Sequence, residues 1–518
     1  MPSLMVQSLM PDASSTVETP PLIPRLLLFG LIGIAGLILL VLLLIGYVNW
    51  QGGRAWENFR AEWEAKGERF ELADFVPKPV PPEQNFATTP LLVPLLDFTR
   101  VPGNPVRWND PKGKERADAL ANLGQILGRK RLPSAGQWQT GTFIDLTEWQ
   151  ALLATNSASA LSPPEAACDV LAALRKFDAD IDELTTASLR PHSVFPIRYE
   201  DNVSALLPHL STLKGISKTV RLRALARLAA GQKAEGLQDV KLGLRLVDAL
   251  KTEPLLISQL VRIANVQIAI QPVWEGLARH DWTEAQLAEL QAALAKVRVL
   301  EDYGRALRGE RALGNAALEE LRSGRLPFSA LGRSMDNGSK VANSAARFIP
   351  SGWFRQNQVT LNRLYQERCL PLVDAAKHRV YAGQTRDADN APELQKAGLY
   401  NLFARLLFPA VSKSAAKFAH AQATLDLATV ACALERHRLA NGQYPDQLDL
   451  LVPRFVEKIP NDVISGEPLK YRRESDGTFT LYSVGWNESD DGGEVFAGKA
   501  GAAPDPNQGD WVWSYTAK

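Results

Sequence analysis

The chain has 518 residues, of which 46% are hydrophobic and 22% are charged, and its formal net charge is +1. This composition is typical of globular proteins, and the length is sufficient for two or three domains. A near-neutral charge provides no basic field to attract phosphates, which argues against a nucleic-acid partner. The three cysteines have no metal-like spacing, so they predict neither a disulfide framework nor a zinc site.

An apolar segment near the N-terminus, Leu26 to Val48, contains no charged residue. A bilayer core about 30 Å thick requires roughly 20 apolar helical residues, so residues 25–48 are predicted to form one transmembrane helix. A cleaved signal peptide is the alternative, but its apolar region is usually roughly 7–15 residues long. Tyr47 and Trp50 also stand where a small-residue cleavage site would be required. We therefore expect an uncleaved anchor, preceded by a disordered tail over residues 1–24.

The charges that flank this anchor do not determine its orientation. More Lys and Arg follow the segment than precede it, which favours a cytoplasmic body. These basic residues alternate with glutamates, however, and long domains cross membranes largely regardless of flanking charge.

Two predicted segments connect the anchor to the rest of the chain. Residues 49–75 have aromatic side chains at helical spacing, among them Trp56, Phe59 and Trp63, and are expected to form an amphipathic helix on the membrane or on the body. Residues 76–163 are rich in proline and are expected to be irregular, with short helices at Gly113 to Leu127 and Asp145 to Leu153.

Residues 164–411 are predicted to form a body of helical hairpins. Leucines at helical spacing stop at Gly231 and resume at Leu237, and Thr283 to Gln286 has the form of a capping box. Antiparallel helical pairs suggest a tetratricopeptide-like array, but no 34-residue period exists, which favours an irregular bundle. Ser329 to Ser351 is expected to be a long loop. The fold class predicted for the chain is mainly α, with a small C-terminal α+β domain.

The sequence contains none of the common catalytic signatures. It has no phosphate-binding glycine loop, no His-Glu-x-x-His and no Gly-x-Ser-x-Gly. The six histidines never form a ligand-like pair and are expected at the surface or at helix ends. Glu310 and Arg311 are expected on a solvated helical face. For an enzyme or a small-ligand binder, we would expect a cleft near Glu310 or near His192 to Tyr199.

The last hundred residues, 412–518, change character. A helix from Ser412 to Leu439 should end at Asn441-Gly442, followed by a β-hairpin and a closing strand at Trp511 to Tyr515. Between the hairpin and the closing strand, hard oxygen ligands crowd a glycine-rich loop. Such ligands suit calcium, although the composition alone favours an acidic exposed turn.

The order of landmarks in this region resembles the C-terminal half of the major pseudopilin of type II secretion systems. The landmarks include Asn441 to Pro445, Ile459 to Asp462, Gly466 to Tyr471, Phe479 to Gly485 and Gly509 to Trp511. The resemblance implies a helix packed on a small sheet and a structural calcium ion in the loop. It assigns as ligands the carbonyls of Leu481 and Ser483 and the side chains of Asn487, Asp490, Asp491 and Asp510.

The chain also departs from that family, because no Gly-Phe-x-x-x-Glu processing signal precedes its anchor. The whole chain therefore looks like long bacterial membrane proteins that carry this module at the C-terminus, and a filament subunit is not expected. The resemblance implies a single-pass protein of the bacterial inner membrane, with a cytoplasmic N-terminus and a periplasmic body. We expect a non-enzymatic envelope scaffold, whose partners are the lipid bilayer and envelope or secretion proteins.

Overall fold

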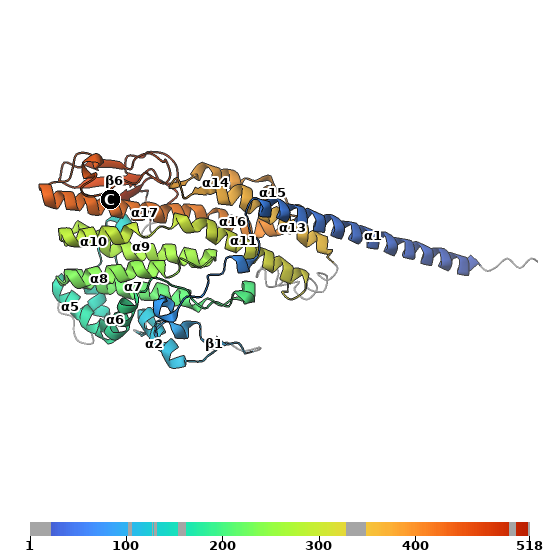
Figure 1. Ribbon diagram of the computed structural model, residues 1–518, viewed down its shortest axis with the longest axis horizontal. Helices are drawn as coiled ribbons and strands as arrows, with labels where there is room; N and C mark the ends of the chain where they lie inside the picture. Colours follow the sequence, from blue (N-terminus) through green and yellow to red (C-terminus); the bar gives the residue numbers. More distant parts are fainter. Residues whose placement is uncertain are drawn as a thin grey trace, which may run out of the picture.

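The computed structural model describes residues 22–101, 106–126, 128, 132–153, 162–327, 349–496 and 504–515. Most of the predicted tail and of the loop from Ser329 to Ser351 lies outside the described residues. Figure 1 shows an elongated helical body from one end of which a single long helix, α1, projects. The mainly α fold class is therefore confirmed.

Helix α1, Leu22–Ala65, unites the predicted anchor and the predicted juxtamembrane helix in one element. The large apolar side chains from Leu27 to Leu44 are 45–69% exposed, and none of the residues in the most apolar part of α1 is buried against the described part of the chain. Among the described residues, α1 is the one helix long and apolar enough to cross a membrane. By length and composition, it could equally be a signal sequence.

The second half of α1 is clamped to helix α13, Ser351–Leu364, through two glycines. A Cβ atom on Gly52 would lie 2.3 Å from the carbonyl oxygen of Gly352, and a Cβ on Gly352 would lie 1.9 Å from that of Val48. The side-chain oxygen of Asn49 also accepts a hydrogen bond from the Gly352 N–H, at 2.9 Å. Only glycine permits backbones to approach this closely.

Beyond the glycines, the predicted aromatic stripe of α1 packs on the body. Trp56 and Phe59 are buried with Phe70 and with Val359 of α13. After α1 ends, Glu68 accepts hydrogen bonds from Arg308 and Arg311 of helix α11, Leu300–Arg322. The C-terminal end of α1 is therefore held to the body by apolar packing and by ion pairs.

The proline-rich segment and the helices after it form one layer of the body, around a core of their own. The predicted short helices are confirmed as α2, Pro111–Ala121, α3, Leu123–Ile126, and α4, Leu146–Leu153. The layer also contains the two-stranded pair of β1, Phe98–Thr99, and β2, Arg107–Trp108, and the helices α5, Pro163–Leu174, and α6, Asp178–Ala187.

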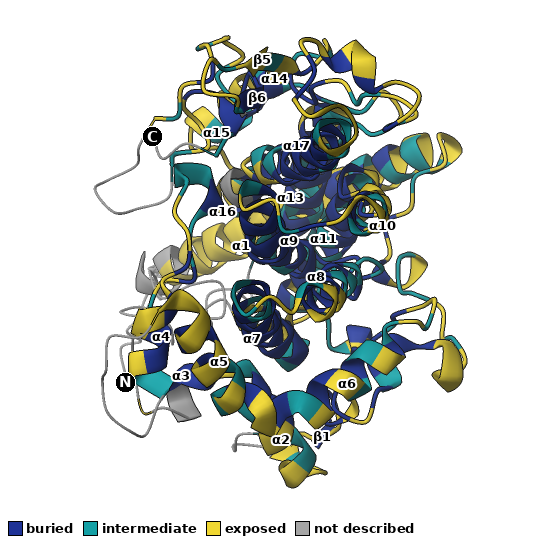
Figure 2. Cartoon of the chain, turned by 90° about the vertical axis from the view of Figure 1, so that its left-hand side faces the viewer, coloured by how far each residue is buried: buried dark blue, intermediate teal, exposed yellow. Residues whose placement is uncertain are grey.

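The main layer is an irregular bundle of longer helices, as expected. Gly231, with φ +77°, joins the predicted hairpin, and the Thr283 capping box is present. Figure 2 shows α9, α11 and α17 buried at the centre of the molecule. The remaining elements are α7, Pro208–Ala229; α8, Lys233–Asp248; α9, Leu256–Ala278; α10, Glu284–Ala295; β3, Val373–Asp374; β4, Arg379–Val380; α14, Ala382–Asp389; α15, Pro392–Gln395; α16, Leu402–Ser412; and α17, Ser414–Asn441.

The C-terminal residues form an antiparallel sheet in the order β5-β6-β7, from Lys470–Arg473, Phe479–Ser483 and Trp511–Trp513. This confirms the predicted hairpin and closing strand. One hydrophobic core continues from α8 through α9 and α17 into this sheet. The C-terminal segment thus shares its core with the helical body.

Replacing Gly352 by alanine should separate α1 from α13, because the added methyl group overlaps the Val48 carbonyl. We expect a loss of about 1–3 kcal/mol in unfolding free energy, the usual cost of overpacking. The measurement is denaturant unfolding of the purified full chain. The matched control is Gly53→Ala, since a Cβ on Gly53 has no atom within 4 Å. Equal stability of the two variants would contradict a close α1–α13 contact.

Candidate functional site

The acidic loop after β6 begins at Gly485, which has φ +70° and lies against the backbone of Gly509. Three of the predicted ligands meet in this loop. The Asn487 side-chain amide donates to Asp491 at 2.7 Å, and the Asp491 backbone N–H donates to Asp510 at 3.3 Å. Asn487, Asp491 and Asp510 are therefore neighbours.

Asp510 is the central side chain of this loop. Its second carboxylate oxygen accepts the Gly493 N–H at 2.6 Å, and the residue is buried. Burial raises the pKa of Asp510, and the nearby Asp490 and Asp491 carboxylates raise it further, while the two backbone N–H groups lower it. A bound cation would relieve this repulsion.

The other predicted ligands are engaged elsewhere. Asp490 accepts the Tyr482 hydroxyl at 3.0 Å and pairs with Lys470 at 3.2 Å, on the outer side of the sheet. Leu481 and Ser483 lie in the central strand β6. No group of three His, Cys, Asp or Glu side chains within the described ranges is arranged to hold a metal ion. Calcium binding at this loop stays a prediction.

A carboxylate not assigned by the sequence reasoning organises the same end of the domain. Asp462 is buried and accepts the Ile464 N–H, the Ser483 hydroxyl and the Val484 N–H, at 2.8, 2.8 and 2.9 Å. These bonds attach the segment before β5 to the end of β6. In the sequence, Asp462 belonged only to the segment Ile459 to Asp462 that carries the pseudopilin resemblance, and nothing there indicated its three hydrogen bonds.

The expectation of a solvated face at Glu310 and Arg311 is wrong. Arg311 is fully buried between Glu68 and the ring of Phe70, whose centroid lies 4.3 Å from the guanidinium. Glu310 is half-buried and accepts the Leu256 N–H at 3.2 Å, at the first residue of α9. Burial raises the pKa of Glu310. Glu310 thus caps a helix, which is a structural role.

The neighbourhood of His192 to Tyr199 borders a cavity of about 930 Å³ between α1 and α11. Ile197 and Tyr199 line its wall, opposite Trp56 of α1. The Tyr199 hydroxyl is buried with no hydrogen-bond partner within the described part of the chain, and burial raises its pKa, so it stays protonated at neutral pH. This cavity agrees in position with the second expected cleft.

The prediction that the histidines lie at the surface or at helix ends fits the positions of His209, at the start of α7, and of the exposed His280, just after α9. It anticipated neither the burial of His209 nor the acidic partner of either residue. His209 is fully buried, stacks on Phe195 and contacts Glu253 at 2.8 Å. His280 contacts the buried Glu435 at 2.9 Å. Their acidic partners are 44 and 155 residues away in sequence, so no local pattern indicates them.

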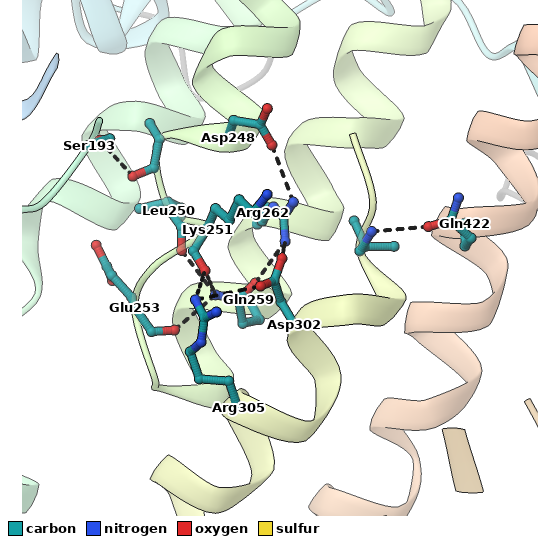
Figure 3. A network of polar contacts seen from close by, with 12 residues as sticks. Ser193, Asp248, Leu250, Lys251, Glu253, Gln259, Arg262, Asp302, Arg305 and Gln422 are labelled. Atoms are coloured by element: carbon teal, nitrogen blue, oxygen red, sulfur yellow. Dashed lines mark hydrogen bonds and ion pairs between the residues drawn. The ribbon is translucent and has the colours of Figure 1, made fainter. Parts of the chain in front are cut away.

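The centre of the body contains a polar network around Arg262, which is fully buried. Its guanidinium contacts Asp302 at 2.7 Å, Asp248 at 3.2 Å and Gln259 at 3.3 Å (Figure 3). The Gln259 amide donates in turn to the carbonyls of Leu250 and Glu253. The network joins the α8–α9 turn to α9 and α11. Its groups pair with one another, except that the buried Arg262 Nε–H has no partner within the described part of the chain.

A second cavity, of about 700 Å³, lies between α10, α17 and residues 453–461. The turn between β3 and β4 places His378 in its wall, in a left-handed conformation with φ +54°. His378 Nε2 contacts Asp426 of α17 at 2.7 Å, and Gln422 donates to the other Asp426 oxygen at 3.0 Å. The Val299 N–H donates to Gln422 and fixes its orientation.

This arrangement forms a His–Asp dyad at a cavity, which the sequence reasoning missed. Burial alone would lower the pKa of His378, but the hydrogen bond and charge of Asp426 outweigh it and raise the pKa. Burial raises the pKa of Asp426. An imidazole held in this way can hydrogen-bond to a molecule in the cavity or accept a proton from it. Within the described part of the chain, no Ser or Cys lines the cavity.

No family model, curated protein or solved structure matches the chain. Function is therefore inferred from the chain's own residues.

Replacing His378 by glutamine should destabilise the protein in a pH-dependent way. Because the folded pKa of His378 lies above its ordinary value of 6.5, its contribution is full below 6.5 and is lost as pH rises through the folded pKa. We expect the melting-temperature difference between wild type and His378→Gln to be largest below pH 6.5 and to shrink at higher pH. The exposed control is His192→Gln. A difference that grows with pH would contradict the raised pKa.

Proposed function

We propose that the chain is a single-pass protein of the bacterial inner membrane, whose periplasmic body is a non-enzymatic scaffold for envelope or secretion proteins. The observation that carries the proposal is the clamp between α1 and α13. Residues 48–52 of α1 contact Gly352 directly, so the body's packing continues to the last residues of the apolar segment. Cleavage after that segment would remove part of a packed interface, which favours a retained anchor.

The secretion-related part of the proposal depends on the pseudopilin resemblance of residues 412–518. Helix α17 contacts both β6 and β7, and this is the arrangement that the resemblance implies. The same resemblance favours a periplasmic body. The buried polar groups of the body favour a scaffold over an enzyme. Arg262 and Glu310 bond to other parts of the fold, so their role there is structural.

In intact cells of the native host, a membrane-impermeant amine cross-linker should join the full chain to envelope proteins. Such a reagent reaches only the periplasmic side, so capture reports the side of the membrane and the class of partner together. A permeant reagent of the same length and reactivity is the control. Capture of partners by the permeant reagent alone would contradict the periplasmic orientation. Capture of no partner by either reagent would contradict the scaffold function.

Calcium should stabilise the full chain if the Asp510 loop binds it. A ligand at 100 times its dissociation constant adds about 2.7 kcal/mol to unfolding free energy, which raises the melting temperature. We expect this rise for wild type and for Asp449→Asn, an exposed acid outside the loop, and its loss in Asp491→Asn. The same melting temperature for wild type with calcium and with chelator would refute the calcium site.

A second candidate function is the binding of a small ligand, favoured by the dyad of His378 and Asp426 at the cavity between α10 and α17. It corresponds to the enzyme or small-ligand alternative, at a place other than the one the sequence suggested. The scaffold is preferred because a His–Asp dyad with no Ser or Cys among the described lining residues does not define a reaction.

A further inference from the structure

Three exposed leucines gather on the surface at the start of α16. Leu399, Leu402 and Leu406, which we term the leucine patch, are 68%, 39% and 50% exposed. Phe403 of the same helix is buried. Single exposed leucines are normal in soluble proteins, but Leu402 and Leu406 lie one turn apart on α16, and Leu399 lies in the turn just before it.

The leucine patch lies beside the point where α1 leaves the body. The indole N–H of Trp353 donates to the Leu399 carbonyl, and the neighbouring Gly352 touches Val48 and Asn49 of α1. Leu399 is therefore next to the end of the apolar segment. Figure 1 shows α13 and α16 at the end of the body from which α1 projects.

The aromatic residues of α1 indicate the level of the membrane surface. Tyr47 and Trp50 are 57% and 59% exposed, and such residues concentrate where the hydrocarbon core meets the headgroups. Because Gly52 and Gly352 hold α1 against α13, the body cannot swing on a flexible tether. The surface adjoining Val48 must then face the bilayer whenever α1 spans it.

We propose that the leucine patch contacts the lipid bilayer beside the anchor, as a second membrane attachment of the same chain. The inference rests on the proposed anchoring of α1. The exposed Lys396 and Arg405 flank the patch, and their positions suit the headgroup region. Two attachments fix the tilt of the body, so the distal end, where α17 ends, points away from the membrane (Figure 1).

The test is nitroxide labelling of the full chain in phospholipid vesicles. Each variant carries one added cysteine in a Cys168→Ser background, and the remaining Cys369 and Cys432 are buried. The labelled positions are Leu399→Cys and Leu402→Cys in the patch, Leu39→Cys in the anchor and Leu439→Cys at the far end of α17. Leu439 is 43% exposed and lies roughly 40 Å of helix beyond the start of α17.

Oxygen concentrates in lipid and a nickel chelate in water, so the two relaxation agents distinguish the environments. We expect the oxygen-to-nickel accessibility ratio at Leu399 and Leu402 to exceed that at Leu439 by at least about tenfold and to approach that at Leu39. A ratio at Leu399 equal to that at Leu439 overturns the proposal. Low accessibility to both agents, as when protein covers the patch, overturns it as well.

The Leu39 label separates this inference from the anchoring on which it rests. If Leu39 reports water, the anchor fails and the patch with it. If Leu39 reports lipid while Leu399 reports water, α1 remains an anchor and only the second attachment fails.

Discussion

The structure depends on the close contact between α1 and α13, where Gly52 and Gly352 bring two backbones together. A transmembrane helix joined to its domain by a flexible linker transmits no orientation. Here the helix packs on the body, where Trp56 and Phe59 form a small hydrophobic cluster with Phe70 and Val359, and leads to Glu68, which pairs with two arginines of α11. The anchor is therefore a structural helix of the body as well as a candidate membrane span.

The ion pairs at Glu68 add specificity to this contact. Burial raises the pKa of Glu68, but its hydrogen bonds and charge interactions with Arg308 and Arg311 outweigh that effect and hold the pKa below its ordinary value. Arg311 also stacks on Phe70, so one side chain contacts both the ion pair at Glu68 and the hydrophobic cluster of Trp56 and Phe59. Loss of Arg311 is consequently expected to weaken the ion pair and the hydrophobic cluster together.

Helix α9 has an analogous role inside the body, because its polar side chains attach segments that lack regular structure. Gln271 accepts the Trp138 N–H at 2.7 Å, and Glu275 accepts the Ile144 N–H at 2.9 Å. Irregular backbone can be buried only when its polar groups find partners. Gln271 and Glu275 of α9 are thus the partners of buried backbone groups in the proline-rich segment.

The sequence by itself determined the elements that depend on neighbours along the chain. The apolar run before Val48, the hairpin at Gly231, the capping box at Thr283 and the strand pair before Val484 all follow from local periodicity and turn chemistry. Only the tertiary structure decided the pairings of distant residues: Gly52 with Gly352, Glu68 with Arg311, and His378 with Asp426. The burial and the pKa shifts of these residues come from such partners, and a single sequence does not show which distant residues will meet.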